Sequence, residues 1–145
     1  MEEYEVGVAL SAEEFTRRMH QLVPISGQLG IVATSLGKSG EAVVRLPYLA
    51  DLVRPGGSIS GPAVMALIDV AMFAGINGHF GWTPMALTAN LNTTFLKPPK
   101  LEDLIGCAKP LRLGRRLAFF EVYVYSSSDQ GSVVAHGTGS YALPQ

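Results

Sequence analysis

The sequence predicts an α+β fold in which a curved antiparallel sheet wraps around one long central helix. The first observation behind this is an apolar stretch at 63–76, which is apolar on all sides and therefore needs to be enclosed. The second is that residues 86–143 read as four strands in series, separated by turns. A twisted antiparallel sheet can curl around such a helix.

The residues before the apolar stretch predict one helix and two strands. Ser11-Ala-Glu-Glu14 is a capping box, so a helix is expected over about 11–22. Pro24 then ends it, because the residue before a proline resists the helical conformation. Strands are expected at 31–36 and 41–46, followed by a loop at 47–60.

The central helix is expected to begin at Ser60-Gly-Pro62 and to end near Gly78. After it, strands are predicted at 86–96, 104–113, 117–126 and 133–143. Alternation in the first of these predicts one face with Leu87, Ala89, Leu91 and Phe95, and another with Thr88, Asn90, Asn92 and Thr94. Pro110 predicts an edge position or a bulge in its strand.

Composition limits the functions that the chain can have. The 145 residues suit a single domain, 1–145, and the combination of 48% hydrophobic with only 16% charged residues suggests that a partner subunit covers apolar surface. A net charge of −1 without a basic run argues against nucleic-acid and anionic-membrane partners. The acidic start Met1–Glu5 does not resemble a secretory signal, and a charge at the centre of the apolar stretch disfavours a membrane span. A soluble cytoplasmic protein is expected.

Cysteine and histidine usage predicts no metal site. Cys107 is the single cysteine, which excludes an internal disulfide, and a small buried side chain is its expected role. His20, His79 and His136 are too scattered for a metal motif.

Asp69 is the only group that can carry a charge within 63–76. An ionised carboxylate among hydrocarbon side chains is costly unless it is paired, solvated or neutralised. Its functional interpretation is a general base or nucleophile. The alternative is a structural carboxylate that caps a backbone group or pairs with an arginine at a subunit interface.

The start of the same helix offers a second group, the backbone N–H of Gly61, which can polarise a carbonyl. Eight residues separate Gly61 from Asp69, about 12 Å along a helix at ~1.5 Å per residue. The two groups therefore cannot act on one carbonyl within one subunit. A two-fold dimer would bring them together.

Two further sets of side chains are candidates. Thr88 could position a water molecule, although its row of polar neighbours could also be a solvated or interface face. Arg115-Arg116, with Lys97 at another strand end, suits a phosphate-bearing ligand. An ordinary solvated turn is the alternative.

The pattern Arg54-Pro-Gly-Gly-Ser-Ile-Ser-Gly-Pro62 with Ala-Leu-Ile-Asp69 resembles the central-helix signature of hotdog-fold acyl-CoA thioesterases of the phenylacetyl-CoA thioesterase (PaaI-like) type. Asn90–Pro98, Gly114–Ala118 and Val134–Gly139 are also similar to that family. The resemblance implies a hotdog fold and hydrolysis of an acyl-CoA thioester without a metal or redox cofactor, coenzyme A being part of the substrate. A homodimer or a dimer-of-dimers tetramer is implied as well.

The resemblance also implies roles. Asp69 matches the catalytic carboxylate, Gly61 the oxyanion donor, Thr88 a water-placing residue, and Arg115 and Arg116 a turn near the CoA phosphates. Arg54 lies at the position where some family members have a polar residue that contacts the thioester. Ser60 replaces the usual His and Pro62 the second glycine, so rate and substrate range can differ. A non-catalytic acyl-CoA-binding module is the alternative, and a hotdog dehydratase is disfavoured because no histidine precedes the helix.

Overall fold

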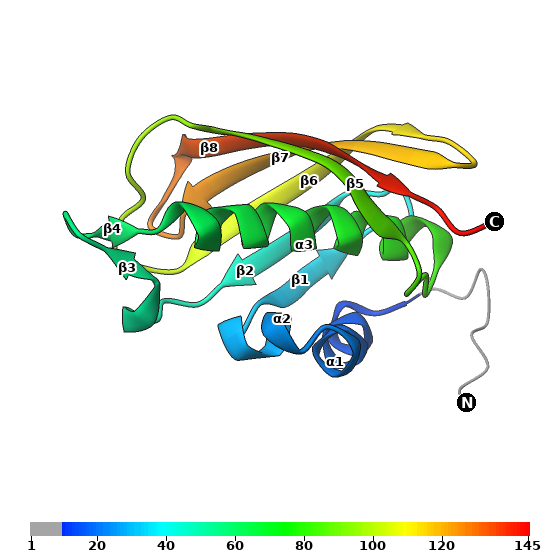
Figure 1. Cartoon of the computed structure of the whole chain (residues 1–145), viewed down its shortest axis with the longest axis horizontal. Coiled ribbons are helices and arrows are strands. Elements are labelled where there is room, and N and C mark those ends of the chain that lie inside the picture. Colours follow the sequence, from blue (N-terminus) through cyan, green and yellow to red (C-terminus); the bar gives the residue numbers. More distant parts are fainter. Residues whose placement is uncertain (1–9) are drawn as a thin grey trace.

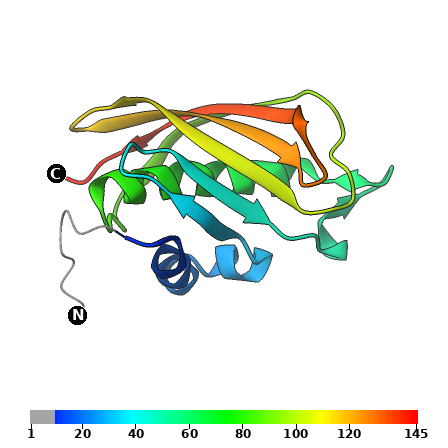
Figure 2. The ribbon, with the colours of Figure 1, turned by 180° about the vertical axis from the view of Figure 1, so that it is seen from behind.

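A computed structural model describes residues 10–145, so the acidic start Met1–Glu5 lies outside the described residues. Six antiparallel strands form one sheet in the order β1-β2-β6-β7-β8-β5, and the central helix α3 lies in its concave face (Figure 1). Helices α1 and α2 lie beside β1, on the same side of the sheet as α3 (Figure 2). The predicted curved sheet around one long helix is confirmed.

The element bounds agree closely with those expected from the sequence. The helices are α1 (Ala12–Leu22), α2 (Pro24–Leu29) and α3 (Gly61–Phe80), with a short 3-10 helix η1 (Ala50–Leu52). The strands are β1 (Val32–Leu36), β2 (Ala42–Leu46), β3 (Val53–Arg54), β4 (Ser58–Ile59), β5 (Leu87–Phe95), β6 (Leu104–Leu113), β7 (Leu117–Ser126) and β8 (Asp129–Ala142). Ser11 caps α1 by accepting a hydrogen bond from Glu14 N–H at 3.1 Å, as the capping box predicts.

Three local expectations need correction. The segment 47–60 is not a plain loop, because η1 and the β3–β4 hairpin form within it. Pro24 ends α1 but begins a second helix, since proline suits the first helical position. Strand β8 begins at Asp129 rather than at 133. Its pairing with β7 is irregular around Tyr125, where the register shifts and accommodates the additional residues of β8. The bulge expected at Pro110 is present between Pro110 and Arg112.

The face assignment in β5 is wrong at its first residues. A bulge between Thr88 and Asn90 inserts Ala89 as an extra residue. Thr88 therefore points toward α3, opposite Tyr141 of β8, whereas Asn90 and the polar residues after it stay on the outer face. Because one inserted residue reverses the side on which every later side chain lies, alternation read from sequence cannot detect it.

Small residues on β8 let α3 approach the sheet closely. A Cβ on Gly137 would lie 2.6 Å from Ile68 Cγ2, and one on Gly139 would lie 2.9 Å from Met72 Sδ. These contacts are shorter than any ordinary packing distance, so both positions require glycine. The close approach fixes how far any side chain at the end of β8 can reach toward α3.

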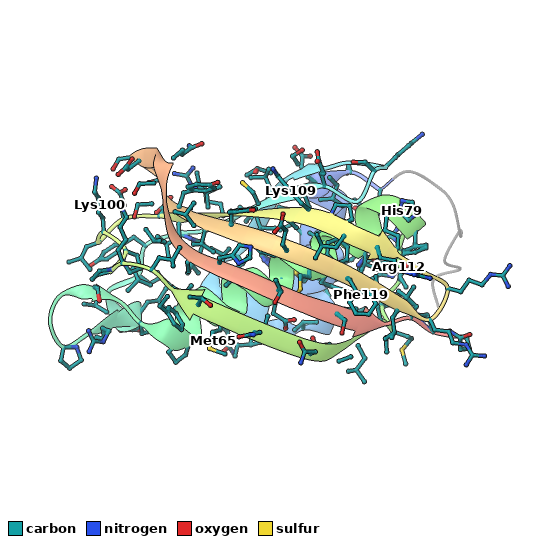
Figure 3. All side chains as sticks on the ribbon, turned by 90° about the horizontal axis from the view of Figure 1, so that it is seen from above. Met65, His79, Lys100, Lys109, Arg112 and Phe119 are labelled. Carbon is teal, nitrogen blue, oxygen red and sulfur yellow. The ribbon has the colours of Figure 1, made fainter. Side chains whose placement is uncertain are left out.

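The expected enclosure of α3 is incomplete. Leu67, Ile68 and Met72 are fully buried, but Met65 is 39% exposed at the β5 edge of the sheet (Figure 3). By length and composition α3 could span a membrane, yet most of it is buried as the core helix. Cys107 also departs from expectation: it is only half-buried on the outer face, where desolvation raises the pKa of its thiol.

Candidate active site

The carboxylate of Asp69 is half-buried and is held by two hydroxyl groups. Thr88 Oγ1 donates to Asp69 Oδ1 at 2.8 Å, and Tyr141 OH donates to the same oxygen at 2.6 Å. Within residues 10–145, no side chain donates to the other oxygen, Oδ2. A carboxylate oxygen without a protein donor can accept a proton or attack an electrophile, so the arrangement suits a base or a nucleophile.

A cavity of about 260 Å³ opens beside this carboxylate. Apart from Asp69, Thr88 and Tyr141, the described residues that line it are apolar: Met19, Val23, Val70, Phe73, Pro84, Ala86 and Leu87. Aromatic rings pack against one another at one side of the cavity. The Phe73 ring stacks on Tyr141 with 6.1 Å between ring centroids and is tilted against Phe15 with 5.5 Å between centroids. An apolar cavity with a few convergent polar groups is the usual form of a small-molecule site.

Tyr141 is the functional-site residue that the sequence interpretation missed. Gly137, Gly139 and Tyr141 alternate in the sequence and so lie on the same face of β8. This spacing could have indicated that the Tyr141 side chain points toward the central helix, where the two glycines allow close packing. Burial, followed by the nearby negative charge of Asp69, raises the pKa of Tyr141 far above its usual range, so the hydroxyl keeps its proton.

The start of α3 forms a separate cavity of about 450 Å³, lined in part by Arg54, Gly61 and Lys97. Gly61 is the first residue of α3, and no described group accepts a hydrogen bond from its N–H. Ser60 is the N-cap, but its hydroxyl makes no capping hydrogen bond. Arg54 lies in β3 and is exposed. The structure thus brings together the residues predicted at the helix start, but not with Asp69.

The basic residues also divide into two groups. Arg115 and Arg116 lie in the β6–β7 turn and line a cavity of about 790 Å³ together with Arg112 and Phe119, which Figure 3 labels on the outer face. Lys97 lies instead in the cavity at Gly61. Its ammonium group donates to Ser132 Oγ and lies 3.8 Å from an Asp129 carboxylate oxygen, so part of its charge is already balanced.

None of the three histidines lies near Asp69 in the described structure. His20 and His79 bond backbone carbonyls, and His136 lies 3.1 Å from Glu121 on the outer face. No group of three potential metal ligands occurs within residues 10–145.

Comparison with known proteins identifies the family of the chain. The sequence profile of the thioesterase superfamily matches residues 56–133. A Mycobacterium tuberculosis protein that bears the provisional name of an esterase is 32% identical over 79% of this chain and 82% of its own length.

Among solved structures, one described as a provisional thioesterase from Silicibacter sp. TM1040 is similar with a TM-score of 0.83 and 30% identity. That match covers 98% of this chain and 96% of the other. A mutant of the phenylacetic acid degradation protein PaaI from Thermus thermophilus gives a TM-score of 0.72 and 28% identity, over 83% and 99% of the two chains. The chain therefore belongs to the thioesterase superfamily, as a hotdog-fold hydrolase of the PaaI-like kind.

Proposed function

We propose that this protein is a soluble, cytoplasmic acyl-CoA thioesterase whose active site is formed by two subunits. The observation that carries the proposal is the Asp69 carboxylate, which lines a largely apolar cavity and accepts two hydroxyl hydrogen bonds on Oδ1 while Oδ2 has no side-chain donor among the described residues. Asp69 would supply the base or nucleophile, and the apolar lining would hold the acyl group. No metal or redox cofactor is required by this chemistry.

In the general-base route, Asp69 Oδ2 takes a proton from water while the water oxygen attacks the thioester carbon. The carbonyl oxygen becomes an oxyanion, the C–S bond breaks, and coenzyme A leaves as a thiolate that then takes up a proton. The Thr88 hydroxyl donates its hydrogen bond to Asp69, so its oxygen remains free to accept a hydrogen bond from the attacking water. In the nucleophilic route, Oδ2 itself attacks, and water then hydrolyses the mixed anhydride.

The oxyanion donor in this proposal is the N–H of Gly61 of the partner subunit. Strand β5 is an edge strand, and its Thr88 end adjoins Asp69 while its Phe95 end adjoins Gly61. Pairing two β5 edges antiparallel about a two-fold axis places the Thr88 end of one subunit beside the Phe95 end of the other. The two separate cavities then join into one site, and exposed apolar side chains such as Met65 become covered.

The remaining predicted residues take supporting roles. Ser60 and Arg54 lie at the helix start, where their polar groups would contact the thioester from the partner side. Arg115 and Arg116 would bind the phosphates of coenzyme A, since guanidinium groups bind phosphate in a bidentate manner. Exposed Phe119, 38% accessible, offers an apolar surface beside them. Lys97 would add positive charge on the partner side.

The test is release of free thiol from short, medium and aromatic acyl-CoA substrates. We expect turnover of at least one substrate, and a loss of about 10²- to 10⁴-fold in kcat for Asp69→Asn. Glu13→Gln, which removes an exposed carboxylate on α1, is the matched control and should behave as the wild type. Undiminished turnover by Asp69→Asn would refute the mechanism. Binding of CoA without turnover of any substrate would refute the thioesterase proposal itself.

A further inference from the structure

We infer that Tyr141 is a positioning residue for Asp69, which orients the carboxylate so that Oδ2 faces the substrate. This inference rests on the proposed function, because it assigns Tyr141 a role within that same site. Tyr141 lies on β8, 72 residues from Asp69 in sequence, and its hydroxyl donates to Asp69 Oδ1 at 2.6 Å.

The location of the hydroxyl is fixed by packing on every side. Tyr141 is 4% exposed, lies between Thr88 of β5 and Ala118 of β7, and stacks on Phe73 with an interplanar angle of 15°. Ala118 leaves room for the ring on that side. Because the glycines earlier on β8 hold the strand close to α3, the phenol oxygen reaches the Asp69 side chain without moving the backbone.

Two donors on one carboxylate oxygen restrict how the group can rotate. Thr88 and Tyr141 both donate to Oδ1, so rotation about the Cβ–Cγ bond would break both of these hydrogen bonds. The two bonds hold Oδ1, and Oδ2 is left without a side-chain donor beside the cavity that Asp69 lines. A catalytic group held by a buried donor is preorganised, and preorganisation accelerates the reaction without altering substrate affinity.

The groups around Asp69 favour Tyr141 as the residue that orients the carboxylate. Among the described residues that line the cavity, Tyr141 is the only other titratable group, and none of them is an arginine, lysine or histidine. Since burial keeps the phenol protonated, Tyr141 supplies a permanent neutral donor rather than a proton for the reaction. A simple structural role is the competing explanation, because Tyr141 OH also lies 3.1 Å from the backbone oxygen of Asp69.

The test is Tyr141→Phe, which keeps the stacked ring and removes only the hydroxyl. We expect kcat to fall about 10- to 100-fold, the range of a hydrogen bond to a charged group, with KM changed less than about twofold. Tyr125→Phe, a phenol on the outer face of β7, is the matched control and should leave both kcat and KM unchanged.

A double variant distinguishes a positioning role of Tyr141 from a purely structural role. In an Asp69→Asn background, the further change Tyr141→Phe should have almost no effect on the residual rate, because both substitutions act through the same carboxylate. A lowered melting temperature of Tyr141→Phe with an unaltered kcat would overturn the inference and leave a structural role. If Asp69→Asn abolishes turnover while Tyr141→Phe does not alter it, the inference fails but the proposed function stands.

Discussion

Mixing two inactive variants tests whether the active site spans two subunits. Gly61→Pro removes the proposed oxyanion donor, because proline has no N–H. Proline suits the first helical position, and Ser60 before it is already extended, with φ −66° and ψ 152°, as a residue preceding proline prefers. Gly61→Ala is the matched control: its Cβ would lie 3.4 Å from Phe95 Cζ, an ordinary contact, and the N–H remains.

The expected magnitudes follow from the geometry of α3. Asp69 lies eight residues beyond Gly61 in one unbroken helix, about 12 Å away at ~1.5 Å per residue, so each proposed site takes the two groups from different subunits. Gly61→Pro alone should lose about 10²- to 10³-fold in kcat. In a heterodimer with Asp69→Asn, one site carries both defects and the other carries neither. Random reassociation makes half of the dimers heterodimers, so the mixture should recover about one quarter of wild-type activity.

The assay is thiol release after the two variants are denatured and refolded together, compared with each variant refolded separately. Heterodimer formation is checked by mass, using an affinity tag on one variant. Activity that stays at the level of the separate variants, although heterodimers have formed, would refute the shared site. A Gly61→Ala enzyme as slow as Gly61→Pro would refute the role of the N–H.

Three further outcomes are expected. Replacing Arg115 and Arg116 by Ala should raise KM for acyl-CoA, and more so at low salt, without affecting a truncated pantetheine thioester that lacks the phosphates. Gly139→Ala should lower the free energy of unfolding by about 1–3 kcal/mol, measured by urea denaturation, because the added Cβ overlaps Met72 and the Asn90 carbonyl. Hydrogen bonds from Arg17 and Arg18 lower the pKa of Glu14 from 4.5 to about 2, so its stabilising contribution should be present above pH 4.5 and be lost as the pH falls toward 2. In Glu14→Gln, the fall in melting temperature between pH 4.5 and 2 should be smaller than in the wild type, while the melting temperature at higher pH should depend on pH as it does in the wild type.

Local sequence signals were sufficient to predict the helices, the strands and the principal candidate residue, Asp69. Ser11, Pro24 and Ser60-Gly-Pro62 mark helix boundaries through short-range backbone effects, which act in the same way in any fold. Strand runs at 104–113 and 117–126 match β6 and β7, because turn residues bound them on both sides. Asp69 was identified because a single carboxylate in an apolar helix is conspicuous without any structural information.

Long-range pairing and packing determine which groups contact Asp69. Tyr141 and Thr88 reach it only because β8 and β5 pair in one particular register, and the bulge at Ala89 turns Thr88 inward against the simple alternation. Register depends on pairing and packing between residues far apart in the chain, so local patterns do not contain it. The division of the candidate residues between two cavities likewise follows from the length of α3 and from the end of β5 at which each residue lies.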